Sequence, residues 1–178
     1  MRWKPHRDKD GNAFSLSHLH PLRYEVVLPA SANLPEVHVN VHIGFGMHCF
    51  TRKIEEDDEP TSSYSDNRES RTFCHERYHF SMHLPEIAKT LATRQLGFAK
   101  DENYVTIDVN DIGDTTVRYA VFLNVKAWKK GEEKNSVLVV IQSAYVLSAG
   151  QTIPGKGKVR FSVLLGHALR GTKPKKPR

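Results

Sequence analysis

Arginine and histidine side chains crowd the stretch of sequence that follows residue 64. Arg68 and Arg71 come first, and His75 and His79 follow. A guanidinium group forms paired hydrogen bonds to phosphate oxygens, and an imidazole exchanges a proton near neutral pH. RNA cleavage without a metal ion needs a base for the 2′-hydroxyl, an acid for the leaving oxygen and a cation for the charged phosphate. We predict these four residues as a catalytic set; the alternative is a solvated loop with local salt bridges.

A second basic group lies near the C-terminus. Tyr145 precedes a glycine-containing loop, and Lys156, Lys158 and Arg160 stand at the end of that loop. Aromatic rings stack on the bases of single strands, and neighbouring cations neutralise their phosphates. We predict these four residues as nucleic-acid-binding, with RNA favoured over DNA as the partner.

Charge is distributed unevenly along the chain. The formal net charge is +6, although residues 55–59 are five consecutive acids. Without those five negative charges, the rest of the chain carries +11. Residues 171–178 form a basic tail interrupted by prolines. Such a balance suits nucleic acid or another polyanion, and the alternative is a charged surface that serves only solubility.

Residues 37–50 alternate between apolar and polar side chains, which is typical of a half-buried strand. The polar face carries three histidines, His38, His42 and His48. These rings suit phosphate binding, metal binding or acid–base chemistry, and the alternative is a plain solvent-facing surface. Gly44 and Gly46 on the same face indicate a bulge or the close approach of another group.

The two cysteines each stand beside a histidine, as His48-Cys49 and Cys74-His75. Neighbouring residues of a strand point to opposite faces, so both members of one pair can hardly bind a single tetrahedral zinc ion. We therefore predict no metal and no cofactor. A histidine-based metal enzyme is the alternative, which elemental analysis of the purified protein would detect.

Composition also bounds the compartment. No apolar run approaches the roughly 20 residues that a membrane-spanning helix needs. The first residues are polar and charged rather than secretory in pattern, and two cysteines do not make a disulfide framework. We predict a cytoplasmic protein with no membrane partner.

The 178 residues fit one domain. We expect an irregular N-terminal arm over residues 1–21, a single α+β domain over 22–170 with an acidic and polar loop at 53–70, and the basic tail. Alternation predicts strands at 78–84, 104–109, 117–128 and 137–147. Pro85 begins a central helix, for which Gly97 is a C-cap. Residues 159–165 are apolar enough for a strand, and residues 163–170 fit a helix equally well.

The predicted fold is therefore α+β: a mostly antiparallel sheet of about six strands, one central helix and a short C-terminal element. The order helix–strand–strand–strand from Leu84 to Leu147, followed by a basic end, resembles the small RelE-type toxin ribonucleases over half the chain. That resemblance implies a toxin-like endoribonuclease, although topology alone does not establish an activity.

The favoured interpretation is a nucleic-acid-binding protein with metal-independent endoribonuclease activity. The rival is a non-enzymatic interaction module, an inhibitor or adaptor such as mobile elements encode. It would dock through the acidic loop and the basic tail. The rival predicts a stoichiometric protein complex and no turnover of RNA.

Overall fold

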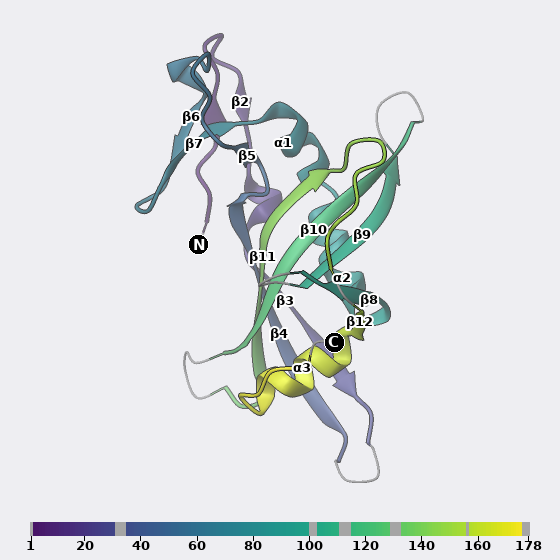
Figure 1. The fold of residues 1–178 in the computed structure, drawn as a ribbon. Coiled ribbons are helices and arrows are strands. Elements are labelled where there is room, and N and C mark those ends of the chain that lie inside the picture. The colour runs from purple at the N-terminus through teal and green to yellow at the C-terminus, as the bar shows by residue number, and fades with distance from the viewer. Residues whose placement is uncertain are drawn as a thin grey trace.

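The computed structural model describes residues 2–30, 35–99, 103–110, 115–128, 133–155 and 157–175. It is an elongated α+β protein with a long twisted sheet, a small sheet near one end and the helix α3 near the other (Figure 1). The elements are β1 His6–Arg7, β2 Ala13–Phe14, η1 Ser17–Leu19, β3 Leu22–Leu28, β4 Val37–His48, β5 Thr51–Arg52, η2 Pro60–Ser62, β6 Ser63–Ser65, β7 Ser70–Phe73, α1 His75–Ser81, α2 Leu84–Lys89, η3 Thr90–Thr93, β8 Gln95–Phe98, β9 Asn103–Asn110, β10 Thr116–Ala127, β11 Ser136–Val146, β12 Lys158–Arg160 and α3 Phe161–Leu169.

The main sheet has seven described strands in the order β12-β8-β9-β10-β11-β4-β3. Every neighbouring pair is antiparallel except β11 and β4, which run parallel. The sheet is therefore mixed, and it is one strand larger than the sequence predicted. The small sheet has the order β5-β7-β6, and β1 pairs with β2 as a separate hairpin.

The alternation of residues 37–50 predicted β4 correctly. Val39, Val41, Ile43 and Met47 are buried, whereas the three histidines of the strand are half-buried or exposed. The buried side belongs to one apolar cluster with side chains of α2, η3 and α3, including Leu84, Ile87, Leu91, Phe161, Leu164 and Leu165. One face of the sheet is thus covered by helices.

The expected single central helix is wrong, because the structure has three α-helices among the described residues. Residues 78–84 alternate in polarity but do not form a strand. Met82 is 43% exposed, so the apolar alternation is not buried, while Phe80, Leu84, Ile87 and Leu91 are buried at helical spacing. The helical period therefore prevails over the period of two.

Gly97 lies in β8 and does not cap a helix. A Cβ atom at Gly97 would lie 2.4 Å from the ring of Tyr104 on β9, so the Tyr104 ring packs directly over this glycine and a larger residue would displace it. The helical stretch ends instead with η3, and Arg94 is already extended. The C-terminal element is both strand and helix, β12 followed by α3.

The N-terminal arm has more structure than we expected. Its described residues contain the β1–β2 hairpin and η1, and Trp3, Leu16 and Leu19 are buried in the main core. The Trp3 indole N–H donates a hydrogen bond to the carbonyl of Phe45 at 3.0 Å. The 53–70 loop likewise contains η2 and β6. Arm and loop together attach the small sheet to one end of β4.

Candidate functional site

A groove of about 670 Å³ lies on the face of the main sheet that the helices leave open. It runs over β3, β4 and β11, and it extends to the N-terminal arm and the β6–β7 turn. The side chains that shape it are Trp3, Arg23, His42, Arg68, Trp128 and Gln142, with Gly44 among the residues of its floor. Cations therefore stand at the edge of a floor that also contains apolar side chains of Leu138 and Val140.

The floor of the groove is open at Gly44, because glycine has no side chain to fill it. A Cβ atom at Gly44 would have no other atom within 4 Å, so packing in the protein does not require glycine there. Gly46 is different, because its Cβ would lie 2.6 Å from the carbonyl oxygen of Gln142. Glycine inside a strand costs roughly 0.5–1 kcal/mol relative to alanine and often marks the close approach of another group. At Gly46 that group is the protein backbone; at Gly44 the space is empty.

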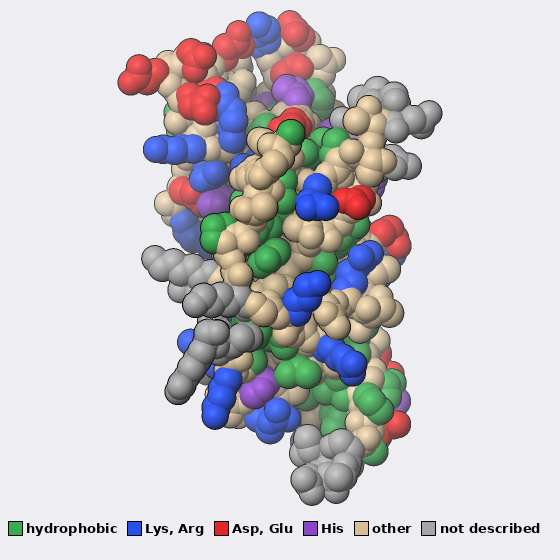
Figure 2. All heavy atoms as spheres, turned by 45° about the vertical axis from the view of Figure 1, so that its right-hand side comes forward, with side chains coloured by type: hydrophobic (Ala, Val, Ile, Leu, Met, Phe, Trp, Pro, Cys, Tyr) green, Lys and Arg blue, Asp and Glu red, His purple; other side chains and the backbone are tan. Residues whose placement is uncertain are grey.

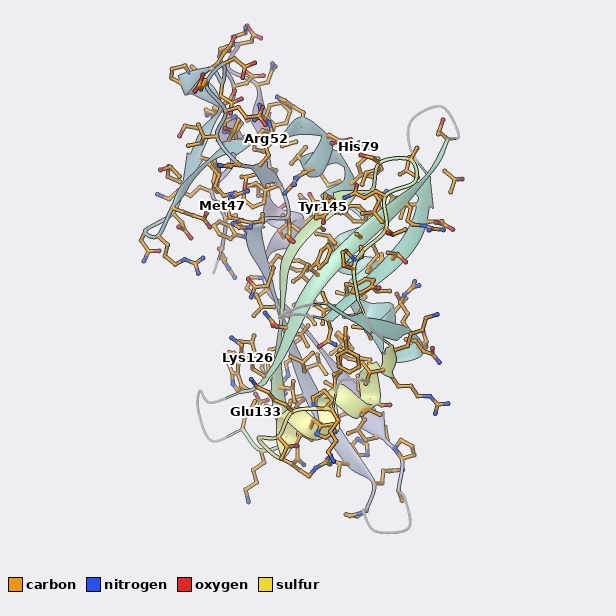
Figure 3. The ribbon with its side chains drawn as sticks, in the orientation of Figure 1. Met47, Arg52, His79, Lys126, Glu133 and Tyr145 are labelled. Atoms are coloured by element: carbon orange, nitrogen blue, oxygen red, sulfur yellow. The ribbon has the colours of Figure 1, made fainter. Side chains whose placement is uncertain are left out.

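One wall of the groove is a stacked pair of rings. His42 and Trp128 lie with centroids 4.4 Å apart and planes 9° from parallel. His42 Nε2 is 2.9 Å from a carboxylate oxygen of Glu133, and the same carboxylate pairs with Arg23. Figure 3 shows Glu133 near Lys126, at one end of β10 and β11. Both rings are thereby held in place, and Trp128 remains only half-buried.

A series of charged groups extends from the groove at Arg68. Arg68 lines the groove, and its guanidinium pairs with Asp66 at 2.9 Å. Hydrogen bonds from the backbone N–H and the side chain of Arg68 hold the pKa of Asp66 below its ordinary value. His48 Nε2 lies 2.8 Å from a Glu69 oxygen, and Glu69 also pairs with Arg71. The hydrogen bond with His48 lowers the pKa of Glu69.

The structure divides the predicted catalytic set. Arg68 reaches the groove, and Arg71 donates from Nε to the hydroxyl of Thr51 at 3.0 Å. His75 packs edge-on against Phe14 and Phe73 at the start of α1, and the ring of His79 lies 5.1 Å from that of Phe80. Neither histidine lines the groove. Figure 3 shows His79 toward the opposite end of the sheet from Lys126 and Glu133.

One sequence signal in this stretch was missed. His75, Glu76 and His79 stand in the order H-E-x-x-H, the spacing that in metalloproteases places two histidines on one helix face. The pairing of Cys74 with His75 as strand neighbours was also wrong, because β7 ends at Phe73 and α1 begins at His75. Within the described ranges, no three side chains of His, Cys, Asp or Glu gather so that they could hold a metal ion. The motif is thus present without a described third ligand.

The predicted nucleic-acid-binding residues do not form one surface either. Lys158 and Arg160 are exposed on β12, and three strands separate β12 from the β11 residue Tyr145. Tyr145 stacks on Phe122 at 5.5 Å, and the guanidinium of Arg77 lies 5.2 Å from its ring centre. Lys156 lies outside the described residues.

Sequence reasoning did not find Arg23 or Trp128, and it grouped Gln142 with the C-terminal residues rather than with β4. Their contributions depend on the pairing of β4 with β3 and β11, which joins residues far apart in the chain. The available signal was the histidine-and-glycine face of β4, which was recognised but not connected to Trp128. The alternation of β4 places His42 and Gly44 on the open face.

The fold and the groove define an α+β protein whose mixed sheet has one face under helices and one face partly open. The chain belongs to the YjaZ family, whose model matches residues 5–169. No curated protein and no solved structure matches the chain. The family description names no activity. Across the described residues, no helix is both long and apolar enough to cross a membrane.

Proposed function

We propose that the protein binds single-stranded nucleic acid, RNA in particular, in the groove around Gly44. The observation that carries the proposal is the empty floor at Gly44 beside the stacked His42–Trp128 pair. A base has a flat apolar face and needs an aromatic platform with open space beside it. Glycine supplies the space, and the rings supply the platform.

The charges at the edge of the groove suit the phosphates of such a strand. Arg23 and Arg68 both line the groove, and the exposed Lys126 lies on β10 beside β11. Each of these arginines pairs with a carboxylate, Arg23 with Glu133 and Arg68 with Asp66, so a phosphate would share the guanidinium group with that carboxylate. Gln142 adds an amide that can accept and donate hydrogen bonds at a base edge. Duplexes are less suited, because their bases are already stacked and their faces hidden.

Cleavage of the bound strand is a separate claim. The sequence assigned it to His75 and His79, yet neither lines the groove, whereas His42 does. We therefore propose binding as the function and treat cleavage as an outcome of the same experiment. RNA incubated with the protein in EDTA, beside a His75→Ala/His79→Ala variant, reports whether metal-free cleavage occurs and whether these two residues carry it.

The test of binding is fluorescence anisotropy with labelled 12-nucleotide RNA, the matching DNA and the RNA duplex. Trp128→Ala should weaken binding of the single strand by about five- to 150-fold, because stacking on one base contributes about 1–3 kcal/mol. Gly44→Val should weaken it about tenfold or more by filling the floor. Thr116→Val introduces valine at an exposed strand position outside the groove and should leave the affinity for RNA unchanged.

Equal affinities of wild type, Gly44→Val and Trp128→Ala would refute the groove as the site. Tighter binding of the duplex than of the single strand would refute the stacking mechanism.

A protein-interaction role is the second candidate, and the acidic segment favours it. Glu55, Glu56, Asp57 and Glu59 are exposed, and acidic side chains gather at the small-sheet end of the molecule (Figure 2). Asp58 is less available to a partner, because it pairs with Arg52 and accepts a hydrogen bond from the Thr72 hydroxyl. This surface suits a basic protein partner. If it is the functional one, a stoichiometric complex will form that Gly44→Val leaves intact.

A further inference from the structure

A second hollow of about 510 Å³ lies between the N-terminal arm and β6. We call it the arm pocket. Its walls are the arm residues Arg2, Lys4, His6 and Arg7 and the strand residues Ser63 and Ser65. Trp3 lines both the arm pocket and the Gly44 groove. The two hollows therefore share one lining residue.

The Asp66–Arg68 ion pair makes a second connection between the hollows. Asp66 lines the arm pocket and Arg68 lines the groove, and their side chains are 2.9 Å apart. The ion pair thus joins a residue of one hollow to a residue of the other.

The arm pocket is strongly positive. Arg2, Lys4 and Arg7 are exposed, and Asp66 is the acid among the residues that line the pocket. Asp66 is already neutralised by Arg68. Among the described residues, none accepts a hydrogen bond or ion pair from the side chains of Arg2 or Lys4, and Arg7 reaches only the carbonyl of Gly11 at 3.4 Å. Three cations therefore remain available for an anion.

These cations sit on a backbone that is fixed rather than loose. The Tyr64 hydroxyl donates to the Lys4 carbonyl at 2.8 Å, and the Trp3 indole donates to the Phe45 carbonyl at 3.0 Å. His6 is buried and stacks on Phe73 with centroids 4.1 Å apart. Donors on a fixed backbone lose less entropy when an anion binds than donors on a loose chain.

We propose that the arm pocket holds the phosphodiester backbone of the same single strand whose base stacks in the Gly44 groove. The inference rests on the proposed function and deepens it, because it makes the ligand a strand of several nucleotides rather than a nucleotide or another small molecule. Arg2, Lys4 and Arg7 supply the phosphate contacts, and Trp3 marks the passage between the two parts. Recognition by the arm depends on charge and is independent of base sequence.

Salt dependence separates the arm pocket from the groove. For single strands, the slope of log K against log salt concentration changes by about 0.7 for each phosphate contact. The variant Arg2→Gln/Lys4→Gln/Arg7→Gln should make the slope for the 12-nucleotide RNA less steep by about 2. Its affinity for a dinucleotide, which is too short to span both hollows, should stay at the wild-type value.

The matched control is Lys89→Gln/Arg94→Gln/Arg170→Gln. It removes the same charge from α2 and from the residues that follow η3 and α3, outside both hollows. The slope of log K against log salt concentration for this control should differ from that of the wild type by less than about 0.7, the value of one phosphate contact. Thermal unfolding of each variant checks that the fold is intact.

The outcomes distinguish the two proposals. A normal slope in the arm variant, together with lost binding in Gly44→Val, overturns the arm pocket and leaves the groove in place. Equal loss of slope in the arm and control variants also overturns it, because the effect is then one of net charge. Absence of any binding of RNA by the wild-type protein overturns the proposed function and this inference with it.

Discussion

The two faces of the main sheet are made by the same strands but face different surroundings. On β4, Val41 and Ile43 lie under helices and are almost fully buried, while the alternating residues His42 and Gly44 border the groove. The covered face is filled by side chains from α2, η3 and α3. The open face has a stacked ring pair and a glycine with empty space above it. One face is built for stability, and the other leaves contacts unmade that a ligand can make.

Removal of a buried side chain from the covered face should destabilise the protein most. Ile43→Ala should lower the free energy of unfolding by about 2–5 kcal/mol, because it removes transfer free energy and leaves a cavity. Leu138→Ala on the half-buried open face should cost about 1 kcal/mol, since less surface is withdrawn from water there. Urea unfolding of both variants measures the difference. Equal losses would show that the open face is covered as completely as the other.

Much of the covered face could be predicted from sequence. The period of two from Val37 to His48 is local, and burial of alternate residues follows from it directly. The stretch that contains Tyr78 and Met82 failed for a physical reason, because its apolar spacing fits both periods and only tertiary burial decides between them. For the same reason His79 was placed on a strand rather than on α1.

The groove could not be predicted in the same way. Its parts come from residues 3, 23, 42–44, 68, 128 and 142, which meet through long-range pairings. The parallel pairing of β11 with β4 is the decisive step, since it brings Leu138 beside His42 and Val140 beside Gly44. Nothing in local periodicity specifies which strand becomes that neighbour. The sequence therefore indicated His42 and Gly44 as unusual, but not the stacking of Trp128 on His42.

The second prediction contrasts the N-terminal arm with the main sheet in acid. Burial lowers the pKa of His6, with the nearby His75 adding to the effect, and burial likewise lowers the pKa of His18. Both histidines bind a proton more readily when the arm is released, with an ordinary pKa near 6.5. The two neutral histidines therefore contribute fully to the stability of the docked arm above about pH 6.5. This contribution is lost as the pH falls toward their lower pKa values in the folded protein. The arm should loosen before the main sheet does.

Tryptophan fluorescence can follow the arm by itself. The chain has two tryptophans, so a Trp128→Phe background leaves Trp3 as the reporter. Its emission should shift toward that of a solvent-exposed ring between pH 7 and pH 5, with no change in the far-UV spectrum of the main sheet. Adding His6→Gln and His18→Gln should remove this pH dependence. An unchanged profile in that variant would exclude the two histidines as its cause.

A single added methyl group at Gly44 compares the two faces most directly, because it should change stability and RNA binding in opposite directions. Gly44→Ala adds a Cβ where no other atom lies within 4 Å. It should raise the free energy of unfolding by about 0.5–1 kcal/mol, since alanine restricts the unfolded chain more than glycine does. The same methyl group should weaken RNA binding by intruding on the groove floor. Gly46→Ala should do the reverse for stability, because its Cβ would meet the Gln142 carbonyl at 2.6 Å. If Gly44→Ala left the protein no more stable, or left binding unchanged, the empty floor would not be a site kept open for a ligand.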